Sequence, residues 1–261
     1  MIFQPERLFN SIVLILIGLI FSFSAGCSKE AKKERHWGRG EKYFSENKFK
    51  EAIIEYKNVL QIEPKDAKAH HKLGLAYLKV GQFREAFSEF TKSIDVNPEL
   101  WDARIQLGNL HLLSRDSKKG REQAEKVLAK EPNNPAGLLL MSSVFLAEKN
   151  IEGAIQEAKK AIQQDPKKVE AYLHLASLYI LKKDFNQAEI NFKEAIRADE
   201  KSIRARIALA DLYRMTGKIK QAEAELVQVT EVTPKEVGAW NRQGSASGGS
   251  AYCIYSRMGL L

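Results

Sequence analysis

Residues 67–98 read AKAHHKLGLAYLKVGQFREAFSEFTKSIDVNP, and this stretch decides the fold of the chain. Apolar residues recur every three or four positions over Ala67–Val80 and again over Phe83–Val96, which is the pattern of two amphipathic helices. Gly81 separates the two segments, and Pro98, which cannot continue a helix, follows the second. The stretch therefore predicts a helix–turn–helix unit.

The same unit recurs along the chain with a period of 34. Prolines at the ends of the units fall at intervals of 34, 34, 34 and twice 34: Pro64, Pro98, Pro132, Pro166 and Pro234. A small residue recurs at the same spacing in the first helix: Gly40, Gly74, Gly108, Ser142, Ala176 and Ala210. A small side chain there lets the two helices of a unit approach closely. A fixed period of this length predicts a repeat architecture, in which stacked units bury the apolar faces that one unit leaves open.

The stretch Leu73-Gly74-Leu75-Ala76-Tyr77, followed by Ala86, Phe90 and Pro98, resembles the consensus of the tetratricopeptide repeat (TPR). The resemblance implies an all-α fold, a TPR α-solenoid of about six helix–turn–helix repeats in a right-handed superhelix. The six predicted repeats fill 33–236: 33–66, 67–100, 101–134, 135–168, 169–202 and 203–236. A seventh repeat is expected to begin at Val237, within a segment, 237–261, that then turns into an irregular or truncated tail.

The N-terminus has the features of an export signal. An apolar run from Ile12 to Phe23 is followed by Ser24-Ala25-Gly26-Cys27, which resembles the lipobox of bacterial lipoproteins. We therefore expect a signal peptide over 1–26, a lipidated Cys27, and a short tether over 27–32. Ser28 then favours the periplasmic face of the outer membrane if the host is Gram-negative. The alternative is a single-pass inner-membrane anchor, because the uncharged stretch from 8 to 28 is about long enough to span a bilayer.

Composition and motifs argue against catalysis and against nucleic-acid binding. The net charge of +8 over 261 residues is modest, and basic residues with interleaved aromatics do not cluster. The five histidines and two cysteines show no metal-ligand spacing, and Ser142-Ser143 falls inside a predicted helix. Carboxylates are scattered beside lysines at helical spacings, as in Glu85–Glu89 and Glu157–Lys160, and we attribute them to solvated helix faces. We expect no enzyme activity, cofactor, metal site or small-molecule substrate.

The family resemblance implies that the first helix of each repeat lines a concave groove that holds segments of other proteins. The positions that would face this groove form an apolar centre: Ile105, Asn109, Leu112, Leu139, Ser143, Leu146, Leu173, Ser177 and Ile180, with Leu113, Ala147 and Leu181 beside them. We expect an extended or helical segment of a partner protein to bind there. In the alternative interpretation, several of these leucines pack between adjacent helices instead.

These features together predict a membrane-anchored scaffold for protein–protein interaction in the bacterial cell envelope. In size and repeat number the chain is similar to lipoproteins that assist pilus secretins or outer-membrane barrels. A second interpretation is a fragment of a longer TPR lipoprotein of an exopolysaccharide or exosortase system. A third is an accessory part of an enzyme whose catalytic domain is missing.

Overall fold

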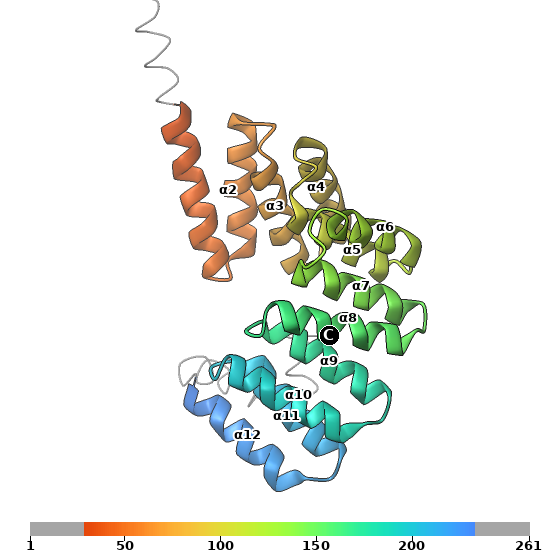
Figure 1. Ribbon diagram of the computed structural model, residues 1–261. Helices are drawn as coiled ribbons and strands as arrows, with labels where there is room; N and C mark the ends of the chain where they lie inside the picture. The colour runs from red at the N-terminus through yellow and green to blue at the C-terminus, as the bar shows by residue number, and fades with distance from the viewer. Residues whose placement is uncertain (1–28, 233–261) are drawn as a thin grey trace, which may run out of the picture. The chain divides into compact units, whose positions relative to one another are not determined.

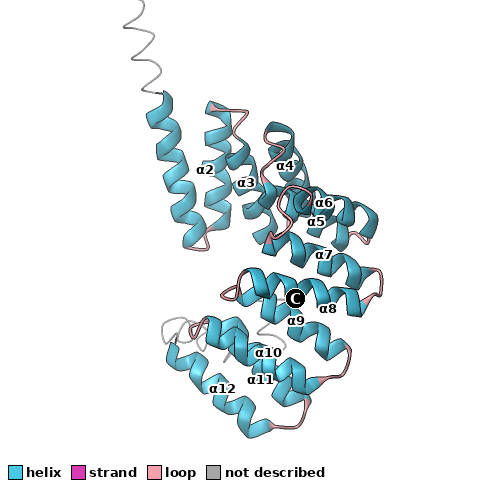
Figure 2. Cartoon of the chain, viewed as in Figure 1, coloured by secondary structure: helices cyan, strands magenta, loops and turns pink. Residues whose placement is uncertain are grey.

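The computed structural model describes residues 29–232, and within that range the chain is helical, with short loops and no strand (Figure 2). The first helix covers residues 29–45. The helices labelled in Figure 1 follow it in chain order: α2 Phe49–Ile62, α3 Ala67–Lys79, α4 Phe83–Val96, α5 Trp101–Leu113, α6 Ser117–Leu128, α7 Pro135–Ala147, α8 Ile151–Gln164, α9 Val169–Leu181, α10 Phe185–Ala198, α11 Ile203–Met215 and α12 Ile219–Val232. The predicted all-α fold class is confirmed. The predicted signal peptide, Cys27 and the start of a seventh repeat lie outside the described residues.

The chain divides into two compact units, of which the first ends at Ala103 and the second begins at Arg104, inside α5. In the first unit α2 packs on α3 and α3 packs on α4. In the second unit each helix from α6 to α12 packs on the next helix along the chain, and α9 also touches α11. Contact between near neighbours in sequence is the arrangement of an α-solenoid, in which each hairpin is stabilised by the hairpins beside it.

The hairpin of α3 and α4 shows why a small residue recurs in the first helix of each repeat. A Cβ atom added to Gly74 would lie 2.6 Å from Cε1 of Phe90, whose side chain is 0% exposed. Gly40 meets Tyr56 in the same way in the preceding hairpin. The prediction that a small residue lets the paired helices approach closely is therefore confirmed. The two helices also match the predicted bounds, except that α3 ends at Lys79 rather than at Val80.

The turn inside each hairpin contains one residue in the left-handed conformation, which recurs with the period of the repeat. Its φ angle lies between 58° and 76° in all six described hairpins: Asn47, Gly81, Arg115, Lys149, Lys183 and Gly217. A left-handed residue reverses the chain within one turn, at a cost of about 1–2 kcal/mol where it is not glycine. The next residue caps the following helix in several repeats; Asp116 Oδ1, for example, accepts a hydrogen bond from Lys119 N at 3.0 Å.

The core of the second unit is continuous from α8 to α12. It contains large side chains that are at most 3% exposed, including Leu175, Leu178, Phe192 and Leu209. Burial of each such side chain contributes roughly 1.5–3 kcal/mol. Because successive hairpins share this core, each hairpin between α8 and α12 buries its apolar face against its neighbours.

The third repeat departs from the consensus, and a side chain of the next repeat fills the space that results. Ala124 replaces the aromatic residue that lies over the glycine in the first two hairpins. The space beside Gly108 is filled instead by Leu140 of α7, whose Cδ2 would lie 2.5 Å from a Cβ atom at Gly108. Leu140 is 2% exposed. A side chain from the next repeat thus replaces one that the third repeat lacks.

Candidate partner-binding face

The predicted groove residues all lie in the second unit, on α5, α7 and α9, the first helices of three successive hairpins. Ile105 is buried, with 7% of its surface exposed. Leu139 and Leu173, its equivalents on α7 and α9, are half-buried and pack against the core of the unit. These three side chains therefore contribute to the core, and Leu139 and Leu173 also leave part of their surface open to solvent.

The polar residues of the predicted set are Asn109, Ser143 and Ser177. Asn109 and Ser177 are exposed, and Ser143 is half-buried. Ser143 Oγ donates a hydrogen bond to Leu139 O at 3.0 Å, and Ser177 Oγ donates to Leu173 O at 2.9 Å. Because these hydroxyl protons are used within their own helices, the serines present a small and nearly neutral surface.

The last turn of each helix carries the remaining apolar residues of the set. Leu146 and Ile180 are half-buried against the core. Leu112 is also half-buried, but its Cδ2 would lie 2.8 Å from a Cβ atom at Gly120, so it packs on α6 within its own hairpin. The structure thus places Leu112 in the contact between the two helices of its hairpin, with part of its surface left exposed.

The last residues of α5, α9 and α11 are the most exposed apolar residues of these helices. Leu113 is 64% exposed, Leu181 is 55% exposed, and Met215 of α11 is 55% exposed. Leu181 stands two repeat periods after Leu113 and Met215 one period after Leu181, so the three hold equivalent places in their repeats. Met215 is absent from the predicted set, although its spacing from Leu181 would have identified it.

Charge is scarce on α7 and α9. All 13 residues of α7 are uncharged, and Glu170 is the one carboxylate on α9, which contains no lysine or arginine. The second helix α8 differs sharply, since it contains Glu152, Glu157 and two lysines. A helix that is apolar all round is normally buried on every side. On α7, however, Ser143, Phe145 and Leu146 keep part of their surface exposed, so this helix presents an uncharged face that its own unit does not cover completely.

In each of four hairpins, two polar side chains that are 19 residues apart in sequence form a contact between the two helices. The distances between the paired atoms are 2.6 Å, 2.6 Å, 3.1 Å and 3.2 Å for His36–Glu55, His70–Glu89, Arg104–Gln123 and Arg206–Glu225. Two of the five histidines are therefore packing residues. The sequence interpretation missed the pair, although both of its members follow the period of the repeat.

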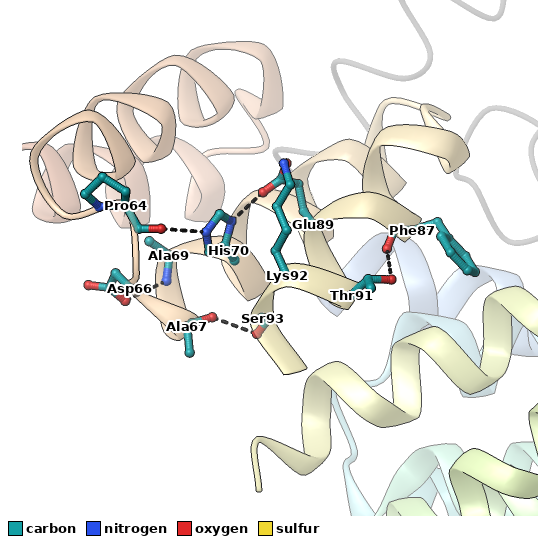
Figure 3. Close-up of polar contacts among 10 residues, drawn as sticks. All are labelled: Pro64, Asp66, Ala67, Ala69, His70, Phe87, Glu89, Thr91, Lys92 and Ser93. Carbon is teal, nitrogen blue, oxygen red and sulfur yellow. Dashed lines mark hydrogen bonds and ion pairs between the residues drawn. The ribbon is translucent and has the colours of Figure 1, made fainter. Parts of the chain in front are cut away.

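His70 shows the pair in detail (Figure 3). Its Nδ1 lies 2.6 Å from Glu89 Oε2, and its Nε2 lies 3.1 Å from the carbonyl oxygen of Pro64. Burial acts to raise the pKa of Glu89, but hydrogen bonds from His70 and Lys92 outweigh it and hold that pKa below its usual value. Glu89 is 8% exposed, so its assignment to a solvated helix face is wrong. It is a structural carboxylate because the histidine and the lysine compensate its charge.

Ser142 and His174 are in contact in the second unit, and the contact has no catalytic character. Ser142 Oγ donates to Ala154 O at 2.6 Å, and His174 Nε2 lies 2.8 Å from the same serine oxygen. Burial lowers the pKa of His174, so the ring is neutral and its Nε2–H donates to the serine. Ser142 is 0% exposed and its proton is already engaged, so it has neither access to a substrate nor a base to activate it.

Metal ligands and membrane spans are both lacking over residues 29–232. No group of three histidine, cysteine, aspartate or glutamate side chains in this range could hold a metal ion. None of the helices in the same range is long and apolar enough to cross a bilayer. Cys27, the predicted lipidation site, precedes the range.

The fold and this face define a class of protein, an α-solenoid built from helix hairpins that repeat with a fixed period. Models of the TPR family match the sequence along most of that array. The model described as TPR repeat matches residues 40–81, and two models described as tetratricopeptide repeat match residues 71–135 and residues 145–190 and 183–242. The chain belongs to the tetratricopeptide repeat family. No curated protein matches the sequence.

Solved structures show the same fold at low sequence identity. A thermophilic TPR protein from Thermus thermophilus matches with a TM-score of 0.59 at 23% identity, over 69% of this chain and 98% of that one. The pilF protein of Pseudomonas aeruginosa matches with a TM-score of 0.57 at 14% identity, over 84% and 99% of the two chains. MamA from Desulfovibrio magneticus RS-1 matches with a TM-score of 0.52 at 20% identity, over 66% and 97%. TPR proteins generally mediate protein–protein interactions, and the fold generally serves as a non-catalytic scaffold.

Proposed function

We propose that this chain is a membrane-anchored scaffold of the bacterial cell envelope that binds uncharged, apolar segments of partner proteins during assembly or secretion of envelope components. The proposal rests on helix α7, which has no charged residue and whose face remains partly exposed. Among the first helices of the repeats, α7 follows α5 and precedes α9. An apolar surface that stays open to water in a folded chain is a marker of an interaction site.

The chemistry of the face defines the partner segment. Leu113, Leu181 and Met215 offer exposed apolar contacts at equivalent places, and Ser177 adds a hydroxyl that is already satisfied. A charged side chain on the partner would lose its hydration on this face and would meet no charged residue on α7 and only Glu170 on α9. The expected ligand is therefore a helix or extended segment with apolar residues on one side and few charges.

Asp211 and Arg214 limit the uncharged face on α11. Arg214 Nη1 lies 3.7 Å from Asp211 Oδ1, so the two charges pair with each other on the surface. A pair of this kind, with both side chains more than 40% exposed, contributes little to stability and is available to a polar end of the partner. The proposed segment thus meets apolar contacts along α7 and α9 and one polar contact at α11.

Site-specific photocrosslinking in cells tests the face directly. A photoreactive amino acid in place of Leu181, and separately in place of Leu113, is expected to form adducts with a protein partner. The matched control is Ile190, which is 49% exposed on α10, a second helix of the same unit. Equal adducts at Ile190, or none at Leu181 and Leu113, would contradict the proposed face.

Charge substitution then tests the chemistry. Leu181→Lys is expected to abolish the adduct formed from the photoreactive residue at 113, whereas Ile190→Lys should leave it unchanged. Leu181 is 55% exposed, so the substitution should change the unfolding midpoint very little. An adduct that survives Leu181→Lys in a folded protein would remove the apolar-segment hypothesis.

The anchor is a separate part of the proposal and has its own experiment. The Ala25-Gly26-Cys27 sequence supports lipidation at Cys27, and Ser28 supports location at the outer membrane, on its periplasmic face in a Gram-negative host. Labelled fatty acid should be incorporated by the full chain and lost in Cys27→Ser. An unlabelled chain of uncleaved length in the inner membrane would favour the single-pass anchor instead.

A second candidate function rests on the sequence after α12. The register of the repeat continues into Val237-Gly238-Ala239-Trp240, and a family model extends to residue 242. These features favour a longer repeat lipoprotein, such as one associated with exopolysaccharide export or an exosortase system. The length of the native reading frame and the identity of its neighbouring genes separate the two candidates.

A further inference from the structure

The first helix, residues 29–45, which precedes α2 in Figure 1, carries more basic than acidic residues. It contains six lysines and arginines and three glutamates. Four of the basic residues recur at spacings of three and four, which places them on one face of the helix: Lys32, Arg35, Arg39 and Lys42. All four are exposed. They form a basic strip along the helix, which we call the basic face.

The basic face is turned away from the contact between this helix and α2. A Cβ atom added to Gly40 would lie 2.6 Å from Cε1 of Tyr56, so the side of the helix that holds Gly40 packs on α2. Gly38 stands three residues after Arg35 and four before Lys42, and a Cβ atom added there would meet nothing within 4 Å. The row that contains Arg35, Gly38 and Lys42 therefore lies in open space.

The glutamates of the first helix do not compensate the charge of the basic face. Glu30 Oε1 lies 3.0 Å from Lys33 Nζ. Glu41 Oε2 accepts a hydrogen bond from Lys72 Nζ of α3 at 2.8 Å. The third glutamate, Glu34, is four residues after Glu30 and seven before Glu41, so all three share a different face of the helix. The acidic and basic residues of the helix are thus separated.

The basic face has little compensation from the rest of its unit as well. Arg39 Nη1 lies 3.5 Å from Glu55 Oε1 of α2, and the arginine side chain remains 48% exposed. Over residues 29–232 no carboxylate forms an ion pair with Lys32, Arg35 or Lys42. These three cations can therefore bind anionic groups from outside the chain without breaking an ion pair within it.

The place of the helix in the chain indicates which anions it meets. It begins two residues after Cys27, where we propose a lipid anchor. Two residues of chain span at most about 7 Å. This is less than the Debye length of about 8 Å at physiological ionic strength, so the helix starts within the field of the lipid headgroups. The alternative single-pass anchor would end at residue 28 and would bring the helix equally close.

We propose that the basic face binds the anionic headgroups of the bilayer that anchors the chain, so that the first helix lies along the membrane surface. The inference rests on the proposed membrane anchoring and holds for either form of the anchor. Arginine binds phosphate oxygens through two parallel hydrogen bonds, and lysine adds an electrostatic attraction. Gly38, between Arg35 and Lys42, leaves room for a headgroup to approach both cations. Because the contact is electrostatic, it weakens as the salt concentration rises.

Fluorescence of the full, membrane-anchored chain in lipid vesicles tests the contact. Dansylalanine incorporated at position 38 reports from the basic face, since a side chain there has open space around it. On vesicles of phosphatidylcholine with phosphatidylglycerol we expect acrylamide quenching several-fold weaker than on phosphatidylcholine alone, and high salt should remove the difference. Both kinds of vesicle hold the same anchor, so the comparison reports on the helix. The mass of the purified chain reports separately whether Cys27 is lipidated.

Charge reversal identifies the residues that bind the headgroups. Arg35→Glu with Lys42→Glu is expected to abolish the protection of the dansyl group. Both side chains are exposed, so the fold should be retained, and circular dichroism checks this. The matched control is Lys79→Glu with Arg84→Glu, at exposed residues of α3 and α4 in the same unit. It changes the net charge equally and should leave the protection intact.

Three results would overturn the proposal. Equal quenching on the two kinds of vesicle would do so and would favour an acidic protein as the occupant of the basic face. Protection in detergent micelles that increases with protein concentration would assign the face to a second copy of the chain. Equal loss of protection in the two charge-reversed variants would mean that the net charge of the unit, and not the basic face, attracts the bilayer.

Discussion

The hairpins α3/α4 and α7/α8 follow the same repeat pattern but are stabilised by different chemistry. In α3/α4 an aromatic ring lies over a glycine, and a histidine pairs with a buried glutamate. In α7/α8 the equivalent places, two periods later, are aliphatic or small: Leu138 for His70, Ser142 for Gly74 and Ala158 for Phe90. The two hairpins therefore satisfy one pattern with two sets of contacts.

The first helices of the two hairpins also differ in the charges on the surface that they can offer to a partner. Helix α3 carries three lysines, Lys68, Lys72 and Lys79, beside its core residues. Helix α7 has no charged residue at all. A repeat fold thus separates the contacts that hold its helices together from the surface that it presents, since changes of surface leave the register of the repeat intact.

The aromatic contact of α3/α4 should be the most costly to remove. Phe90 is 0% exposed, and Phe90→Ala leaves a cavity beside Gly74, so we expect a loss of about 4 kcal/mol in the free energy of unfolding. Hydrogen exchange of α3 and α4 and urea denaturation measure the effect. The control is Phe83→Ala, at a residue 51% exposed on the same helix, with an expected loss below about 1 kcal/mol. Similar losses for both variants would contradict the assigned packing role.

The second largest loss of stability is expected when the contact between His70 and Glu89 is removed. His70→Ala removes a hydrogen bond from the buried Glu89 carboxylate, and we expect a loss of about 2 kcal/mol because Lys92 still compensates part of the charge. Amide exchange in α3 and α4 reports the change. His70→Leu combined with Glu89→Leu replaces both polar partners by apolar side chains and should recover most of the loss. If the double variant is no better than His70→Ala, desolvation of Glu89 does not cause the effect.

Ser142 gives the complementary test in α7/α8. Ser142→Ala removes its bond to Ala154 O and leaves His174 Nε2 without that partner, so we expect a loss of about 1.5 kcal/mol. Ser143→Ala removes only a bond to Leu139 O within one helix and should cost less than about 0.5 kcal/mol. Chemical denaturation of both variants at pH 7 provides the comparison, and equal effects would argue against a structural role for the Ser142–His174 contact.

The positions of helices and turns in α3/α4 could be predicted from sequence because they depend on local physics. Gly81 reverses the chain with a φ of 76°, and Pro98 lies just beyond the end of α4, as its missing amide requires. The close approach at Gly74 was also predictable, since the repeat period brings a small residue to the same place in every hairpin. Regular spacing along the chain carries this information without knowledge of tertiary contacts.

The packing partners of individual side chains were harder to predict, because they involve residues from neighbouring helices. The sequence shows that Ala124 is too small for its place, but not that Leu140 from the next repeat fills the space beside Gly108. The same limit applies to the predicted face, where Leu112 packs towards Gly120. Exposure depends on such replacements, so the spacing alone could not identify Leu113 and Leu181 as the exposed leucines of the set.

The smallest predicted loss of stability concerns Glu189, and this loss depends on pH. It stands one repeat period after Ile155, which is 3% exposed in the core of the second unit. In α10 hydrogen bonds from Lys193 and Lys218 lower the pKa of Glu189 to about 2; burial acts against them, and Tyr213 adds a third hydrogen bond. The contact between Glu189 Oε2 and Lys218 Nζ, at 2.8 Å, links α10 to the turn after α11.

A carboxylate whose folded pKa is below its unfolded value stabilises the fold above the unfolded pKa, and this contribution disappears as the pH falls through the folded pKa. For Glu189 that window extends from about pH 4.5 down to about pH 2. Glu189→Gln should therefore cost about 1 kcal/mol at pH 7, since solvent screens the interaction with the exposed lysines, and the cost should shrink steadily as the pH falls towards 2. Urea denaturation of the two proteins across this range measures the difference.

Glu194→Gln, at a carboxylate that is 36% exposed on the same helix, is the control for the general effect of acid. A constant difference between parent and Glu189→Gln from pH 7 to pH 2 would mean that packing, and not the charge of Glu189, links α10 to the next hairpin.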